Sequence, residues 1–493
     1  MRLPRRDEEP VRPVARPTVP RRLNVARAGG LLVGVELLGT VIGFASTVYF
    51  AQTLGATALG VFFLFEALLS TVATLADFGI RGAVEKRVSE GEDPGQFLAA
   101  GALLKLLMLG VLAAVVLVFR GPINAYVGAP VAGLLVVAVV LFELSALTIH
   151  VLRGELRTGQ TAVLYLLRLL TYVVLAVVLL QFGYGVQALV YALIASYVVL
   201  LVGGLARLST RPALPSRRHV RSVVDYAKFN GIWGLGGHVY NTMDLLVVGF
   251  FLTQADVAAY ELAWRVTLMT GVVGGVVANT IFAQLSAWHA TGETARIRTT
   301  VRDSMTASLF LVVPAVFGVA VLGEAILGVV FGAEYVVAAA AFTVLMGEKV
   351  VAAVNGVFDA AVRGVDRPDI GAGATAVSLT VNVALNFLLV PRYGLVGAAA
   401  ATGLAMALNT VALGWFLNRV VPVALPLRDV AWLTAAGAAM GAVLLAVESA
   451  VPGESVLTLA GLVALGGVVY LLVVAASPSL RTKLRATIAD VGG

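Results

Sequence analysis

Long apolar segments alternate with short polar connections along almost the whole chain. A helix needs about 20 predominantly apolar residues to cross the hydrocarbon core of a bilayer. The apolar segments are near this length, so the pattern predicts about fourteen transmembrane helices. The predicted spans are 30–51, 57–78, 97–118, 130–151, 159–180, 186–206, 228–252, 257–282, 304–323, 336–360, 370–390, 395–417, 429–448 and 456–476.

The composition agrees with a chain that has lipid as its outer solvent. It is 59% hydrophobic and 13% charged, with a mean hydropathy of +0.95, whereas soluble domains carry about 25% charged residues. The 52 glycines allow close helix packing in lipid. The predicted fold class is therefore all-α, a polytopic transmembrane helical bundle.

Basic residues gather in alternate connections. If the N-terminus is cytoplasmic, the inside segments hold 28 of the 35 Lys and Arg, and the outside turns hold only Arg120 and Arg392. Because cytoplasmic loops collect Lys and Arg, this asymmetry predicts that both termini are cytoplasmic. It also explains the net charge of +7 without nucleic acid as a partner.

Cysteine is absent and only four histidines are scattered along the chain. Disulfides, thiolate metal sites and a cysteine nucleophile are therefore excluded, and we expect no metal and no cofactor. The predicted external turns are also short. They leave no room for a soluble catalytic domain, which argues against a membrane glycan ligase or polymerase.

Two regions resemble each other at an offset of 210 residues. In both 152–160 and 362–370, an Arg-Gly pair is followed three residues later by a second arginine, and 183–188 resembles 393–398 after the next apolar span. We interpret this as a duplication of six helices. Six is an even number, so both halves would run the same way through the membrane, as in parallel-repeat transporters.

The duplication predicts two six-helix lobes and an extra helix pair. The predicted domains are a disordered basic cytoplasmic tail (1–27), the N-lobe (28–206), a cytoplasmic linker (207–227), the C-lobe (228–418), helices 13 and 14 (419–477) and a cytoplasmic tail (478–493).

The first helix of each predicted lobe is rich in glycine. Gly34 and Gly39 lie in the first, and Gly234 and Gly236 in the seventh. Paired glycine-interrupted segments mark moving elements and binding sites in transporters, so these four positions are candidate hinges. Close helix packing explains the same glycines equally well.

Several runs of sequence resemble one family of transporters. Residues 382–402 resemble the late-helix signature of polysaccharide-repeat-unit flippases, in the multidrug/oligosaccharidyl-lipid/polysaccharide exporter superfamily. The regions 243–249, 259–263, 54–60 and 77–79 resemble other parts of that pattern. The resemblance covers nearly the whole chain. It implies two six-helix lobes around a central cavity, with two further helices.

The resemblance also implies the activity: export of a glycan linked to polyprenyl phosphate or pyrophosphate, by alternating access in the cell membrane and without covalent chemistry. The implied partners are the lipid-linked glycan and membrane lipids. H⁺ or Na⁺ as a coupling ion, and glycosyltransferases of the same pathway, are open alternatives. A drug or cation antiporter of the same superfamily also remains open, although it would need an acidic cavity.

Charged residues inside predicted spans are the candidate binding residues, because a charge at the bilayer centre costs at least about 2.5 kcal/mol without a partner or water. Arg168 is in the middle of its span, where a guanidinium can bind phosphate oxygens bidentately. Lys105 is a second candidate, although it could extend towards the cytoplasm. Arg265 either faces the cavity or pairs with Glu261 one turn away.

The seventh predicted helix carries His238 and Asp244 beside its glycines. Both are candidate substrate-binding residues. Asp244 is also a candidate for a coupling ion, or alternatively a counter-charge for Arg265. Glu348 and Asp359 lie with Asn355 on one stripe of the tenth helix, because seven and eleven residues return a helix to nearly the same face. They are further candidates for the coupling ion.

Overall fold

The computed structural model describes residues 25–450, 453 and 455–481, and these form helices and turns without any strand. The elements are α1 (Val25–Leu54), α2 (Ala56–Asp77), α3 (Ile80–Glu90), α4 (Pro94–Val118), α5 (Arg120–Val127), α6 (Ala132–Gly154), α7 (Thr158–Gln181), α8 (Val186–Leu205), α9 (Arg217–Phe251), α10 (Gln254–Thr270), α11 (Val272–Ala290), α12 (Thr294–Ala325), the π-helix η1 (Ile326–Phe331), the 3₁₀ helix η2 (Ala333–Ala338), α13 (Ala339–Gly364), α14 (Pro368–Val420), α15 (Leu427–Glu448) and α16 (Val456–Ala475). The predicted tails lie mostly outside the described residues.

The all-α transmembrane class is confirmed, but the number fourteen is not. Ten described helices are long and apolar enough to cross a membrane, or eleven if α10 and α11, bent by 49°, form one span. The predicted spans 370–390 and 395–417 both lie within α14. Gly394 breaks this helix with φ 57° and ψ −136°, a conformation that suits glycine. Long helices such as α4 and α7 expose many apolar side chains, as a lipid-facing surface requires.

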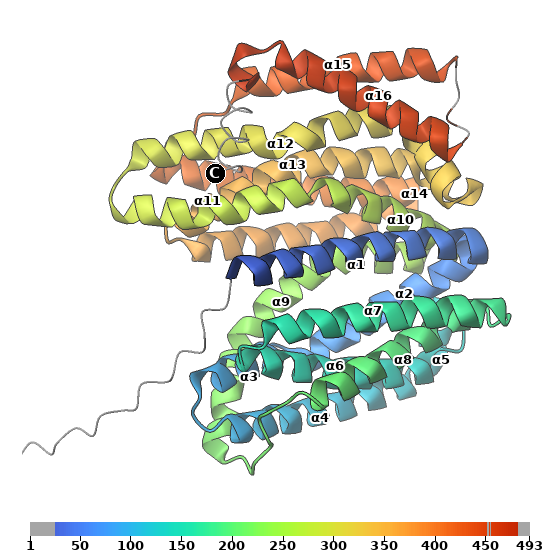
Figure 1. Ribbon diagram of the computed structural model, residues 1–493, viewed down its shortest axis with the longest axis vertical. Coiled ribbons are helices and arrows are strands. Elements are labelled where there is room, and N and C mark those ends of the chain that lie inside the picture. Colours follow the sequence, from blue (N-terminus) through green and yellow to red (C-terminus); the bar gives the residue numbers. More distant parts are fainter. Residues whose placement is uncertain (1–24, 451–452, 454, 482–493) are drawn as a thin grey trace, which may run out of the picture.

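The helices form two groups that follow the sequence (Figure 1). The blue-to-green group α2–α8 occupies the lower half of the view, and the yellow-to-orange group α10–α14 the upper half, with α15 and α16 at the top against α12. Helix α9 crosses between them. Its start packs on α3 and α4 through Val223 and Ala227, and its later part packs on α14.

The turn between α6 and α7 has the same backbone structure as the turn between α13 and α14. Four hydrogen bonds in 151–160 recur between residues numbered 210 higher, in 361–370. Leu156 and Asp366 both have φ of 60°, which is uncommon for residues other than glycine. This recurrence supports the predicted duplication, while the division into lobes at 28–206 and 228–418 stays a prediction.

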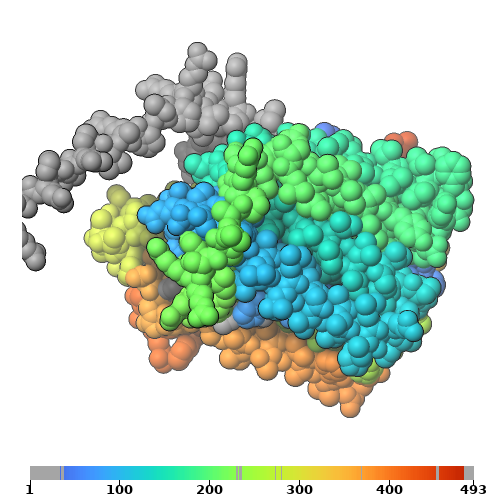
Figure 2. Space-filling view, turned by 90° about the horizontal axis from the view of Figure 1, so that it is seen from below, coloured from blue at the N-terminus to red at the C-terminus, as the bar shows by residue number. Residues whose placement is uncertain are grey.

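The linker between the groups is tied to one end of the bundle, which we call the linker end. The N–H of Ala213 donates to the carbonyl of Gly95, and Figure 2 shows the bright green linker and the start of α9 against the blue surface of α3 and α4. Burial would raise the pKa of Glu155, but N–H groups of Thr210 and Ser209 donate to its carboxylate and lower it. The linker is thereby fixed to the α6–α7 turn.

At the opposite end, the two groups are in tight contact. A Cβ added to Gly60 on α2 would lie 1.7 Å from the carbonyl oxygen of Gln254, and one added to Gly249 on α9 would lie 2.4 Å from Leu64. Only glycine allows such approaches. The cavities described below therefore lie between groups that are closed against each other at this end.

Candidate functional site

Arg265 joins the two helix groups through a pair of carboxylates. Its Nε donates to Glu261 at 2.7 Å, within α10, and its Nη2 donates to Glu66 of α2 at 3.2 Å. The guanidinium also lies over the ring of Phe63, 4.5 Å from the centroid. The predicted pairing with Glu261 is present, and Glu66 adds an ion pair between the groups.

Arg265 nevertheless lines open space. One cavity of about 160 Å³ lies between α1, α2, α7 and α10, and a second of about 280 Å³ lies between α2, α6, α8, α9 and α10. Both are lined by Phe63, Glu66 and Arg265. The two alternatives for Arg265, a structural pair or a cavity residue, are thus both realised in this conformation.

Arg168 lies on the smaller cavity together with Arg265. Its guanidinium carbon is 5.8 Å from the ring centroid of Tyr197. None of the ion pairs formed by the described residues includes Arg168. A cation at this depth needs a partner, water or a ligand, so Arg168 can take an anionic ligand in the cavity that it shares with Arg265 and Glu66.

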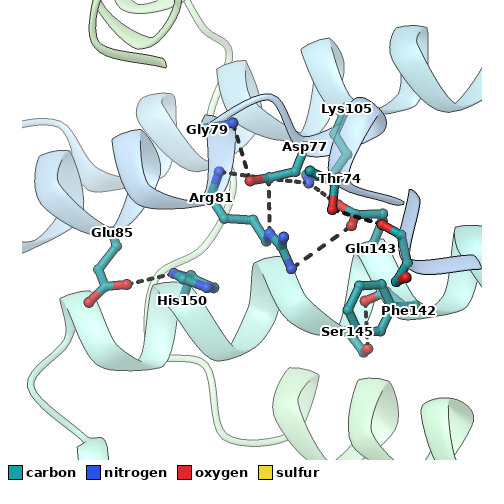
Figure 3. Close-up of polar contacts among 11 residues, drawn as sticks. Thr74, Asp77, Gly79, Arg81, Glu85, Lys105, Phe142, Glu143, Ser145 and His150 are labelled. Atoms are coloured by element: carbon teal, nitrogen blue, oxygen red, sulfur yellow. Dashed lines mark hydrogen bonds and ion pairs between the residues drawn. The ribbon is translucent and has the colours of Figure 1, made fainter. Parts of the chain in front are cut away.

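Lys105 has a different environment (Figure 3). It is fully buried, and its Nζ donates to Asp77 at 2.8 Å and to Glu143. Arg81 closes the network, with Nε 2.9 Å from Asp77 and Nη1 3.9 Å from Glu143. Two cations and two carboxylates balance here. Lys105 lines neither cavity, and its charge is satisfied inside the protein.

Asp244 of α9 is a buried carboxylate held by neutral groups. It accepts hydrogen bonds from Tyr260 at 2.9 Å, from Asn386 at 2.7 Å and from Thr402. In the part of the chain that the structure describes, it has no cationic partner. Arg265 pairs with Glu66 and Glu261 instead, so in this conformation Asp244 is not its counter-charge.

Asp244 therefore faces the NH₂ of one amide and two hydroxyl groups, and further amide and hydroxyl groups adjoin them. Asn382 donates to Thr402 at 3.0 Å, and Oδ1 of Asn386 is buried without a hydrogen-bond partner among the described residues. Hard monovalent or divalent cations prefer such oxygen ligands. No group of three or more His, Cys, Asp or Glu suited to a metal occurs in the described residues.

The other predicted residues lie apart. His238 of α9 is hydrogen-bonded to Thr71 of α2 at 2.9 Å, a contact between α9 and the first helix group. Glu348 is buried and already engaged, because Tyr240 donates to it at 2.9 Å and Lys349 pairs with it at 2.7 Å. Asp359 lines a separate cavity between α9, α13 and α14.

The candidate hinge glycines have open surroundings where the structure describes them. A Cβ at Gly34 would meet nothing within 4 Å, one at Gly39 would lie 3.7 Å from Leu169, and one at Gly236 would lie 3.4 Å from Leu379. The surroundings of Gly234 lie outside the described residues. Close packing therefore does not require glycine at the three described positions, so bending stays a prediction.

Sequence reasoning missed the partners of these charges as site residues. The sequence analysis did not single out Glu66, and it included Asn386 and Thr402 only as positions of the 382–402 run. The run itself was a usable signal, because two asparagines four residues apart place two amides on one face of a helix.

Comparisons with known proteins concern the family and the fold. The family described as "Polysaccharide biosynthesis protein" matches residues 54–340. The chain is 39% identical over 437 residues to a probable low-salt glycan biosynthesis flippase of Haloferax volcanii, covering 89% of this chain and 93% of that protein. It is 28% identical over 398 residues to a second probable flippase of that organism, covering 79% and 82%.

A solved structure shows the same fold. The lipid II flippase MurJ, in an inward closed conformation, aligns with a TM-score of 0.77 over 90% of this chain and 98% of that one. The identity is 15%, so this likeness concerns the arrangement of helices alone.

Proposed function

The chain belongs to the polysaccharide biosynthesis protein family, within the multidrug/oligosaccharidyl-lipid/polysaccharide exporter superfamily, and we propose that it translocates a lipid-linked oligosaccharide across the cell membrane by alternating access. The linkage is a polyprenyl phosphate or pyrophosphate. The protein binds and moves the glycan without covalent chemistry, and the glycosyltransferases that build the glycan act before it.

The position of Arg168 is the main support for the proposed substrate class. Arg168 is a guanidinium at mid-span, it faces a cavity with Arg265, and none of the described carboxylates forms an ion pair with it. Two guanidinium groups can hold a phosphate or pyrophosphate through charge-assisted bidentate hydrogen bonds. A cation antiporter would need the opposite charge at this place.

Substrate binding would also loosen the contact between the two helix groups. Glu66 holds Arg265 across the α2–α10 boundary at 3.2 Å, and a phosphate on Arg265 would compete with that carboxylate. An anionic ligand therefore releases one ion pair between the lobes as it binds. This differential interaction is what a ligand needs in order to shift a conformational equilibrium.

Asp244 is the proposed coupling-ion site. Its carboxylate is held by an amide NH₂ and by hydroxyl groups and has no cationic partner among the described residues, whereas Glu348 is occupied by Lys349 and Tyr240. Na⁺ would take oxygens of Asp244, Asn386 and Thr402. H⁺ would neutralise the carboxylate directly.

The proposed orientation places the linker end, with both termini, in the cytoplasm of a plasma-membrane protein. Single cysteines at 121–128 or 325–334 should react with an impermeant thiol reagent in intact cells, because these segments lie at the end opposite the linker. The matched control is a cysteine in 212–218. Labelling of that control, with no labelling of the other two segments, would reverse the orientation.

The transport test uses the full chain in proteoliposomes with a polyprenyl-phosphate-linked oligosaccharide. Arg168→Ala should slow translocation at least tenfold, since hydrogen bonds to charged groups contribute about 1.5–3 kcal/mol each, while the protein stays folded. Arg168→Lys should retain part of the rate. Normal translocation by Arg168→Ala, or no translocation by the unaltered chain, would contradict the proposal.

A further inference from the structure

A third cavity, of about 420 Å³, lies between α9, α13 and α14. Asn355, Asp359, Thr375, Ser378 and Asn409 line it with polar groups. Small-ligand sites measure roughly 300–1,000 Å³ and combine apolar walls with a few placed polar groups. The cavity has that size and character.

One buried acceptor points to a ligand. Asn409 is 8% exposed, and its Oδ1 has no hydrogen-bond partner in the part of the chain that the structure describes. A buried acceptor left without a partner is costly. Nearby, the amide of Asn355 donates to Thr410 at 3.1 Å, which fixes this side chain at the cavity wall.

The cavity does not concentrate charge of either sign. Among the described residues that line it, Asp359 is the single charged one, and its charge is balanced by Arg363 at 2.9 Å. Gly236 and Gly237 form part of the wall, and a Cβ at Gly237 would meet nothing within 4 Å. Amides, hydroxyls and apolar side chains suit a neutral, hydroxyl-bearing ligand rather than a phosphate.

The internal repeat allows this cavity and the guanidinium cavity to be compared at equivalent positions. At the offset of 210 residues, Arg168 and Leu169 of the first half correspond to Ser378 and Leu379 of the second. The first pair lines the guanidinium cavity, and the second pair lines the amide cavity. Related positions thus carry a cation in one half and a neutral hydroxyl in the other.

We propose that the cavity at Asn355, Asp359 and Asn409 is a subsite for neutral sugar residues of the transported lipid-linked glycan, while the phosphate occupies the Arg168–Arg265 cavity. This assignment rests on the proposed function. Hydroxyl groups of a sugar donate to Oδ1 of Asn409 and to Asp359, and the glycine wall accommodates the ring. The two halves of the protein thereby bind two chemically different parts of one substrate.

The test compares two probes on the full chain by native mass spectrometry: polyprenyl phosphate alone, and the same lipid phosphate carrying a neutral oligosaccharide. Asn409→Leu removes the unsatisfied acceptor at similar volume. It should weaken binding of the glycosylated probe about tenfold and leave the bare lipid phosphate unchanged, with a melting temperature equal to or above that of the unaltered protein.

A second variant and a control keep the test independent of folding. Ala376→Leu fills the cavity from α14 and should also weaken only the glycosylated probe. Val377→Leu changes the neighbouring exposed residue and should change neither. Equal loss of both probes in Asn409→Leu, no loss of either, or a lower melting temperature would overturn the subsite.

If the proposed function is wrong, the same binding experiment gives a different result. Arg168→Ala should weaken both probes alike, because both carry the phosphate. If bare lipid phosphate binds the Arg168→Ala variant normally, the phosphate site is wrong, whatever the outcome at Asn409. If the pocket variants bind both probes normally but lose dependence on an ion gradient, the cavity holds a coupling ion and not sugars.

Discussion

Lys105 and Arg168 are both cations inside predicted spans, yet their surroundings differ. Lys105 is fully buried between Asp77 and Glu143, and Arg81 completes a balanced network. Arg168 faces a cavity and forms none of the ion pairs of the described residues. A buried charge in ion pairs with the protein stabilises one arrangement of helices, whereas a charge that forms no such pair and faces a cavity is available to a ligand.

The largest expected effect is a loss of stability when Lys105 is removed from its network with Asp77, Glu143 and Arg81. Lys105→Met leaves two carboxylates with one remaining cation, and breaking a buried pair costs about 3–5 kcal/mol. We therefore expect strongly reduced thermal stability and yield in detergent. Arg168→Met is the matched control and should keep nearly normal stability. Equal destabilisation by both substitutions would remove the distinction between the two sites.

Asp244 extends the comparison to an anion without a counter-charge. Asp244→Asn preserves hydrogen bonding but removes the charge, so an Na⁺ or H⁺ gradient should no longer accelerate translocation. At a high gradient, the translocation rate should be about tenfold lower than that of the unaltered protein. Glu348→Gln is the control, since its carboxylate already has partners. The measurement is initial translocation rate in proteoliposomes with each gradient imposed separately. A preserved gradient response in Asp244→Asn would exclude this residue as the coupling site.

Substitution of Glu66 tests whether its carboxylate competes with phosphate for Arg265. Glu66→Gln removes the charge that competes with phosphate, so a polyprenyl phosphate should bind about three- to tenfold more tightly, the equivalent of roughly 1 kcal/mol. Glu261→Gln provides the comparison within α10, where no contact between the helix groups is lost. Weaker binding after Glu66→Gln would show that the carboxylate supports the site instead of competing for it.

The smallest effect is expected at the glycines of α9. Replacement of Gly234 and Gly236 by alanine stiffens the helix by about 1 kcal/mol per residue, so translocation should slow a few-fold, with normal folding and glycan binding. The same replacement at Gly231 is a packing control, because its Cβ would lie 2.6 Å from the carbonyl oxygen of Phe78. A full translocation rate in the double variant would leave Gly234 and Gly236 without a role in bending.

The sequence by itself determined the membrane class, the helical fold and the family. These follow from local quantities: apolar length, the spacing of small residues, and a run of letters such as 382–402. It also determined the offset of 210 residues, and the repeated hydrogen bonds at the α6–α7 and α13–α14 turns agree with that offset. Each of these signals is read from short stretches of the sequence or from a comparison of such stretches, so no long-range contact was needed.

Only the tertiary structure decided which charges are satisfied. Arg168 and Arg265 are 97 positions apart, and Lys105 meets Asp77 and Glu143 from three different helices. Sequence periodicity gives the face of a helix on which a charge lies, but not the helix that this face meets. Because the cost of a buried charge depends on that neighbour, packing alone separated the structural Lys105 from the half-buried Arg168 on its cavity.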